Sequence, residues 1–154
     1  QAEDSEYRQA ALQVGKEVIE RLKGQSLRGE AVVETIQVLD LNRDGTPEIF
    51  AAIKQGSTVN ENTSQQTNPT GFATLWLTYK NGTPQLLETI QAAVSATRIQ
   101  RSPHHEFLGA VDMTGDGIEE VILKRTDYEY AVFEIYEYKN NRLNRVFSGA
   151  GFGC

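Results

Sequence analysis

The sequence predicts a mainly β protein with an N-terminal α-helix and two four-stranded antiparallel units, each similar to a propeller blade. Three observations predict this fold class. Apolar residues near the N-terminus recur at helical spacing, later segments are typical of strands separated by turns, and the second half of the chain repeats the first. Two units cannot close a propeller, which needs about four blades or more. We therefore expect one domain over residues 1–154, with two sheets facing each other and the helix packed alongside.

Residues 4–24 are predicted to form an amphipathic helix. Asp4 or Ser5 can cap its start, and Gly24 can end it. Its apolar residues recur every three or four positions and so share one face: Tyr7, Ala11, Val14, Val18 and Leu22. The other face mixes acidic and basic side chains and lacks the basic bias of membrane-surface helices. The helix is therefore expected to cover part of a larger core.

Residues 30–91 are predicted to form the first four-stranded unit. Strands are expected at residues 32–38, 49–53, 72–79 and 85–90. The polar segment 55–71 is expected to be a long, exposed and mobile loop, and Asn81-Gly82 is typical of a tight hairpin turn. The segment 91–101 fits either a continuation of the last strand or a short helix.

Residues 104–151 repeat this organisation as the second unit. Residues 36–45 align with 108–117 across an acidic turn, and residues 72–81 align with 131–140 across the hairpin. Most apolar positions match apolar ones. Each unit therefore runs strand, acidic loop, strand, loop, strand, tight turn, strand, which is typical of propeller blades or of paired antiparallel sheets.

Charge and composition exclude several classes of function. The net charge is −6, the pI is near 5.0, and no basic run is present, which argues against a nucleic-acid partner. No segment approaches the roughly 18 apolar residues of a membrane span. The single cysteine, Cys154, excludes a disulfide within the chain and a C-x-x-C zinc or redox motif.

The two acidic turns carry oxygen-bearing residues at alternate positions. Counting the first aspartate as position one, side-chain oxygens fall at positions one, three, five and nine, and a backbone carbonyl falls at seven. These residues are Asp40, Asn42, Asp44, Thr46 (carbonyl) and Glu48 in the first turn, and Asp112, Thr114, Asp116, Ile118 (carbonyl) and Glu120 in the second. Calcium takes six to eight oxygen ligands. Gly45 and Gly117 occupy position six, where the chain must turn with a positive φ.

Repulsion among three carboxylates in one turn favours a bound cation, so the pattern predicts two Ca²⁺ sites. They are not EF-hands. Position twelve would need a carboxylate but holds Ala51 or Leu123, and the flanking segments are predicted strands, not helices.

The pattern Asp-x-Asx-x-Asp-Gly-x-x-Glu between two strands resembles the calcium loops of FG-GAP and VCBS-type repeats, found in integrin-like propellers and many extracytoplasmic bacterial proteins. The resemblance covers two stretches of about 20 residues and, more loosely, the hairpin after each. It implies calcium ligation by the ten residues given above and a location outside the cytoplasm, periplasmic or secreted. The phenylalanine-glycine and glycine-alanine-proline signatures of the family are not evident. Thr114 replaces the usual Asp or Asn, so the second site is expected to be weaker or to bind through a water.

Other interpretations compete with calcium binding. The acidic turns could be plain Asx turns. The pair His104-His105 is expected to be exposed, and acidic residues that alternate with tyrosines near the C-terminus are expected in solvent, apart from Glu134, which shares the parity of Tyr136 and Tyr138. No catalytic residue is predicted, because no nucleophile elbow, phosphate loop or dinucleotide motif is present.

The sequence thus favours a calcium-binding, non-enzymatic β-repeat domain that acts as an interaction or accessory module for a protein or glycan partner. The alternative is a hydrolase-like enzyme on a calcium-stabilised scaffold, with the 55–71 loop as a lid.

Overall fold

The computed structural model describes residues 2–24, 30–56, 59–60, 65–66, 70–127 and 130–150. In chain order its elements are α1 (Ala2–Lys23), β1 (Ala31–Leu39), β2 (Glu48–Gln55), β3 (Val59–Asn60), β4 (Gln65–Gln66), β5 (Gly71–Lys80), β6 (Thr83–Ala93), α2 (Ala96–Arg101), β7 (His104–Val111), β8 (Glu120–Thr126), β9 (Ala131–Lys139) and β10 (Arg142–Ala150).

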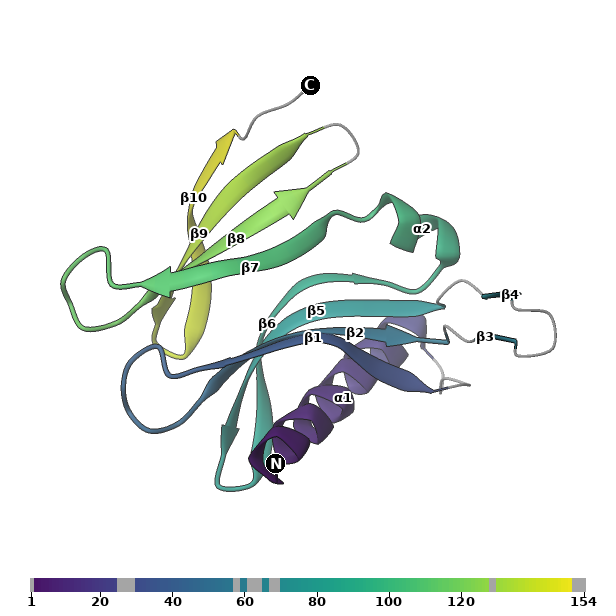
Figure 1. The fold of residues 1–154 in the computed structure, drawn as a ribbon, viewed down its shortest axis with the longest axis horizontal. Helices are drawn as coiled ribbons and strands as arrows, with labels where there is room; N and C mark the ends of the chain where they lie inside the picture. Colours follow the sequence, from purple (N-terminus) through teal and green to yellow (C-terminus); the bar gives the residue numbers. More distant parts are fainter. Residues whose placement is uncertain are drawn as a thin grey trace.

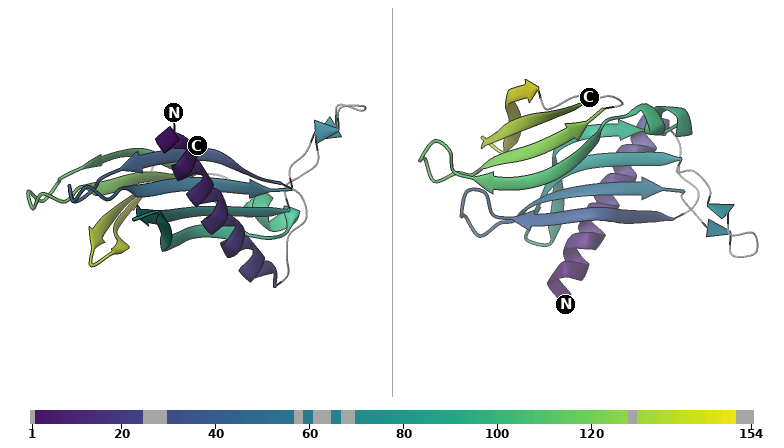
Figure 2. Two further views of the ribbon diagram at one scale, coloured as in Figure 1. Left: turned by 90° about the horizontal axis from the view of Figure 1, so that it is seen from below. Right: turned by 45° about the horizontal axis from the view of Figure 1, so that its top comes forward.

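The strands form two four-stranded antiparallel sheets, and the predicted fold class is confirmed. The first sheet has the order β1-β2-β5-β6 and the second the order β10-β9-β8-β7. Helix α1 crosses one face of the first sheet obliquely, and the second sheet lies on the other side (Figures 1 and 2). Within the described residues the sheets close into neither a barrel nor a propeller. The first sheet is therefore the middle layer of three.

Both faces of the first sheet are covered, which explains the continuous apolar runs of its central strands. Strands β2 and β5 are buried along almost their whole length. Ile49 and Leu75 belong to the core against α1, while Phe50 and Trp76 belong to the core against the second sheet. A strand that is buried on both faces has no need for polar residues at alternate positions.

Helix α1 packs much as predicted, although its buried face is rotated. Ala11 and Val14 are buried as expected, but Leu22 is 53% exposed and Ile19 is fully buried in its place. The contact is close because Gly15 has no side chain: a Cβ there would lie 2.5 Å from Cγ1 of Ile53 on β2. Gly24 ends the helix with φ +80°, as its position predicts.

An aromatic cluster joins the two sheets. Phe50 and Trp76 from the first sheet lie 5.3 Å apart between ring centroids, and Phe107 from β7 lies 6.1 Å from Phe50 and 6.4 Å from Trp76. On β9, Tyr136 and Tyr138 face the same core. The residues of the second sheet that face away from this core are more exposed than those that face it.

Two predicted segments differ in detail from the structure. In the ambiguous segment 91–101, β6 continues to Ala93 and the short helix α2 then begins at Ala96, so both alternatives are present in turn. The predicted loop 55–71 contains the short pair β3–β4, and its end residues belong to β2 and β5. Much of that loop, and its predicted mobility, lies outside the described residues.

Candidate metal centres

Each acidic turn closes a β-hairpin at the same point of its sheet. Leu39 at the end of β1 pairs with Glu48 at the start of β2, and Val111 pairs with Glu120 in the second unit. The residue after each of these strands is the first aspartate of the turn, so the ladder holds positions one and nine close together. Because of this register, the carboxylates that follow the first strand and begin the second lie at the same end of the hairpin.

The carboxylates meet as the spacing predicts. One oxygen from each of Asp40, Asp44 and Glu48 lies within 4.8 Å of the other two. Asp112, Asp116 and Glu120 form the matching group in the second unit, also within 4.8 Å of one another. Each group could hold a metal ion.

The turn backbone takes two left-handed residues in each unit. Position six has φ +85° at Gly45 and +86° at Gly117, which confirms the predicted positive φ. Position four is also left-handed, with φ +58° at Arg43 and +78° at Gly115, and this was not predicted. Arg43 adopts this conformation although it has a Cβ, so the first turn holds a mildly strained residue where the second has glycine.

Backbone N–H groups bind the first aspartate of each turn. In the first unit Asp40 accepts hydrogen bonds from the N–H groups of Asp44 (3.1 Å) and Gly45 (2.9 Å). In the second, Asp112 accepts from Gly115 and Gly117, both at 2.8 Å. The Gly117 N–H, followed by the other donors of the turn, holds the pKa of Asp112 below its usual value. Asp112 is therefore favoured in its ionised form.

The aspartate at position five accepts a hydrogen bond from the backbone N–H at position seven, which fixes the second half of the turn. Asp44 accepts from the N–H of Thr46 at 2.8 Å, and Asp116 accepts from the N–H of Ile118 at 3.0 Å. Asx turns are thus part of the geometry, as the competing interpretation predicts. They do not account for the glutamate at position nine, which comes from the strand.

Glu48 is fully buried, and only one of its oxygens is satisfied. Oε1 accepts a hydrogen bond from the N–H of Leu41 at 2.7 Å, whereas Oε2 is buried and has no partner among the described residues. Burial raises the pKa of Glu48 to about 7, the Leu41 N–H opposes the rise, and the charges of Asp44 and Asp40 add to it. Oδ1 of Asn42 is likewise buried without a partner. Two unpartnered buried oxygens beside two aspartates are costly unless something binds them.

The second centre repeats the hydrogen bond to the glutamate at position nine and differs at position three. Oε1 of Glu120 accepts from the N–H of Met113 at 3.0 Å, as Glu48 does from Leu41. Thr114, however, is exposed, whereas its counterpart Asn42 is half-buried. The substitution therefore changes both the ligand chemistry and the burial at position three.

The two centres lie next to each other. Figure 1 shows both turns at the same end of the molecule, and the N–H of Glu119 donates to the carbonyl oxygen of Leu41 at 2.8 Å. Tyr138, from the second sheet, lies near the first turn. Burial raises the pKa of Tyr138 to about 12, and the charges of Glu48 and Asp44 add to the effect. The first centre therefore lies at the interface between the two repeats.

The donor set selects for a hard cation. Every side chain predicted to bind offers oxygen, and neither a nitrogen nor a sulfur ligand occurs in the two groups. Carboxylate, amide and carbonyl oxygens suit calcium, whereas zinc sites are built mainly from histidine and cysteine.

A second charged cluster was missed at the sequence level. Glu134 is 1% exposed and accepts hydrogen bonds from Arg125 (3.1 Å), Arg145 (3.0 Å) and the hydroxyl of Tyr136 (3.1 Å). His105 lies 3.4 Å from it, with its side chain only 4% exposed, so the expected exposed pair is wrong for this histidine. Burial is the main cause that lowers the pKa of His105. The parity that Glu134 shares with Tyr136 was the signal.

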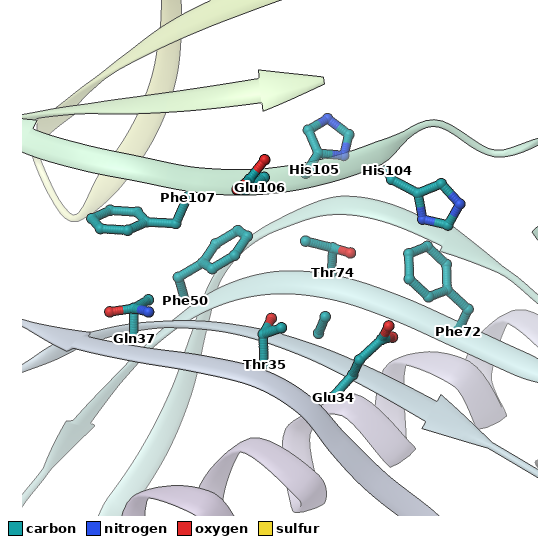
Figure 3. A pocket seen from close by; sticks show the side chains of 11 residues that line it. Glu34, Thr35, Gln37, Phe50, Phe72, Thr74, His104, His105, Glu106 and Phe107 are labelled. Carbon is teal, nitrogen blue, oxygen red and sulfur yellow. The ribbon is translucent and has the colours of Figure 1, made fainter. Parts of the chain in front are cut away.

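A cleft of about 340 Å³ lies between the first sheet and β7 (Figure 3). Its walls carry aromatic side chains, with Phe107 beside Phe50 and His104 edge-on to Phe72. Glu34 at its rim pairs with Lys54 at 3.1 Å. Neither serine nor cysteine is among the described residues that line it. Its polar lining is supplied by threonine, histidine, glutamine and glutamate side chains.

Comparisons with known proteins add no relative: no protein-family model, no curated protein and no solved structure matches this chain. Of the helices in the described ranges, none has the length and apolar character to cross a membrane.

Proposed function

We propose that this chain is a calcium-binding, non-enzymatic β-repeat domain that works outside the cytoplasm as an interaction or accessory module. The observation that carries the proposal is Glu48: a fully buried carboxylate with one oxygen unpartnered, facing two aspartates within 4.8 Å. A cation supplies the missing partner and neutralises the repulsion. The same triad recurs in the second unit.

Calcium fits this donor set better than magnesium. Calcium accepts six to eight oxygens in flexible geometry, and each turn offers three carboxylates, one amide or hydroxyl group, and the carbonyl of Thr46 or Ile118. Magnesium requires nearly ideal octahedral geometry and keeps several waters. A turn that wraps the ion with alternate residues therefore favours calcium.

The resemblance to FG-GAP and VCBS-type loops supports an extracytoplasmic role. Loops of modest affinity are useful where calcium is millimolar, as it is outside cells. The aromatic side chains that line the cleft are the feature that favours a binding module over the hydrolase alternative. In this proposal calcium holds the strand-connecting turns rigid, and the partner is a protein or a glycan.

Thermal unfolding with and without calcium tests the proposal. When free calcium is about 100 times Kd, each filled site adds about 2.7 kcal/mol to the free energy of unfolding. For a chain of this size that raises Tm by roughly 5–10 °C per site. Excess EDTA should reverse the shift, and magnesium at the same concentration should give a smaller one.

The matched control removes one ligand from each turn. The double variant Asp44→Ala, Asp116→Ala should fold but show no calcium-dependent shift, because each triad loses a carboxylate. An unchanged Tm for the wild-type protein at millimolar calcium would refute the proposal.

A further inference from the structure

The two turns are joined through Leu41, which hydrogen-bonds to both units. Its N–H donates to Oε1 of Glu48, a predicted ligand of the first centre, at 2.7 Å. Its carbonyl oxygen accepts the N–H of Glu119, in the second turn, at 2.8 Å. Leu41 is itself fully buried in the core between the sheets. The connection is therefore shielded from water and held in place by packing.

The peptide group that makes this connection also belongs to the second centre. The N–H of Glu119 and the carbonyl of Ile118 are parts of one planar peptide unit. The Ile118 carbonyl is the predicted ligand at position seven. A cation on that oxygen polarises the peptide and makes its N–H a stronger donor to Leu41. The stronger hydrogen bond acts on Leu41, whose own N–H positions Glu48.

The residue at position eight of the first turn shows what happens when this N–H is missing. Position eight is Glu119 in the second turn and Pro47 in the first. Proline has no N–H, so the first turn cannot donate a hydrogen bond from this position. The same turn geometry nevertheless forms around it, with matching φ values of +85° and +86° at position six. The first turn therefore tolerates proline at position eight, and in the second turn the N–H at this position makes the contact between the turns.

We propose that the two calcium sites are coupled, so that filling one raises the affinity of the other, and that the Glu119 N–H to Leu41 carbonyl hydrogen bond transmits the effect. This inference rests on the proposed function, since it needs both turns to bind calcium. An ion in the first site orders Glu48 and, through it, Leu41. The Glu119 N–H is then bound to an acceptor that is already fixed in place. The second ion therefore loses less conformational entropy when it orders the second turn. By linkage the effect is equal in both directions.

Calcium titration by calorimetry tests the coupling with three proteins. The wild type should bind two ions with positive cooperativity. Glu119→Pro should still bind two ions but independently, because it removes the N–H that connects the turns together with the side chain of Glu119. Glu119→Ala keeps the N–H while losing the carboxylate, and should remain cooperative. Cooperativity that persists in Glu119→Pro, or disappears equally in Glu119→Ala, would overturn the role of this hydrogen bond.

Single-site variants measure the coupling without the proline. Asp44→Ala leaves the second site and Asp116→Ala leaves the first, which yields one intrinsic binding constant from each. The product of the two wild-type constants should exceed the product of these intrinsic constants by at least about fivefold. Equal products would mean that the sites are independent, which overturns the coupling and leaves calcium binding intact. A wild-type protein that binds no calcium would instead refute the proposed function itself.

Discussion

Glu48 shows how much a single residue contributes to the properties of the first centre. It is the first residue of β2, it lies opposite Leu39, and the sheet buries it completely. Its neighbours are acidic, so burial and repulsion together raise its pKa to about 7, from an ordinary value of 4.5. Without an ion this residue opposes folding at neutral pH, and in the proposed function it is a ligand of the first site.

The pH dependence of stability in the calcium-free protein follows from this pKa. Between about pH 4.5 and 7 the folded state binds more protons at Glu48 than the unfolded chain does. The free energy of unfolding therefore falls as pH rises through this window, by up to about 3 kcal/mol. Glu48→Gln keeps an acceptor for Leu41 but cannot ionise, so it should lack this slope and be the more stable protein at pH 8 in EDTA.

Urea unfolding at several pH values, in EDTA and in calcium, measures this difference. His105 contributes equally to both proteins, so its titration cancels in the comparison. In saturating calcium the order should reverse, because the glutamine variant has lost a ligand of the first site. Parallel pH profiles for the two proteins in EDTA would contradict the assigned pKa.

At the scale of elements, the contact between α1 and the first sheet depends on two glycines. Gly15 lets the helix approach Ile53, and Gly71 lets β5 approach Ile19, where a Cβ would lie 2.6 Å from Cγ2. Each glycine thus faces an isoleucine from the opposite element. Close approach of this kind buries more of the apolar face than a larger residue would permit.

Gly15→Ala should destabilise the protein although alanine is the better helix former. Alanine gains about 1 kcal/mol of helix propensity, but the new methyl group collides with the branched side chain of Ile53, and overpacking costs about 1–3 kcal/mol. We expect a net loss of about 1 kcal/mol in urea unfolding. Gln13→Ala, on the exposed face of the same helix, should change stability by less than about 0.5 kcal/mol.

A double-mutant cycle identifies the cause. With Ile53→Ala in the background, Gly15→Ala should become neutral or stabilising, because the opposing atoms are gone. The same loss in both backgrounds would show that the collision with Ile53 is not responsible.

At the scale of the whole molecule, the three layers share continuous packing. The first sheet contributes one face to each core, and Phe107 of the second sheet packs on Phe50 and Trp76 of the first. The hydrogen bond between Glu119 and Leu41 adds a polar link at one end of the interface. Cores that share a central sheet are expected to unfold together.

Unfolding should therefore be one cooperative transition for both repeats. Trp76, the single tryptophan, is fully buried between the sheets and reports on their packing. Its fluorescence and the far-UV circular dichroism should change at the same urea concentration. Phe107→Ala should lower the free energy of unfolding by about 2–3 kcal/mol, less than for a fully buried phenylalanine, and should shift both signals together. Two separated transitions would show that the sheets fold independently.

Much of the fold and of the candidate metal centres can be predicted from the sequence, because the patterns that predict them are local. The helix follows from apolar spacing, and its end follows from Gly24. The acidic turns follow from alternate oxygens and from glycine at position six, since both depend on a few consecutive residues. The duplication adds the strand order, because each unit repeats the same hairpins.

Other features depend on residues brought together from distant parts of the chain. Leu22 is exposed although its spacing places it on the apolar face, because the buried face of α1 is rotated towards Ile19, which contacts β5 at Gly71. His105 is buried because Glu134 and its arginines surround it. Neither outcome is visible in the pattern around the residue itself.

The pattern of predicted ligands at each turn is thus contained in nine consecutive residues, and it predicts where the carboxylates lie close together. The burial of Glu48, its raised pKa and the bond from Glu119 to Leu41 depend on the packing of one repeat against the other. The physical reason is range: backbone turns and side-chain spacing act over a few residues, whereas desolvation and contacts between repeats arise only after the sheets have packed.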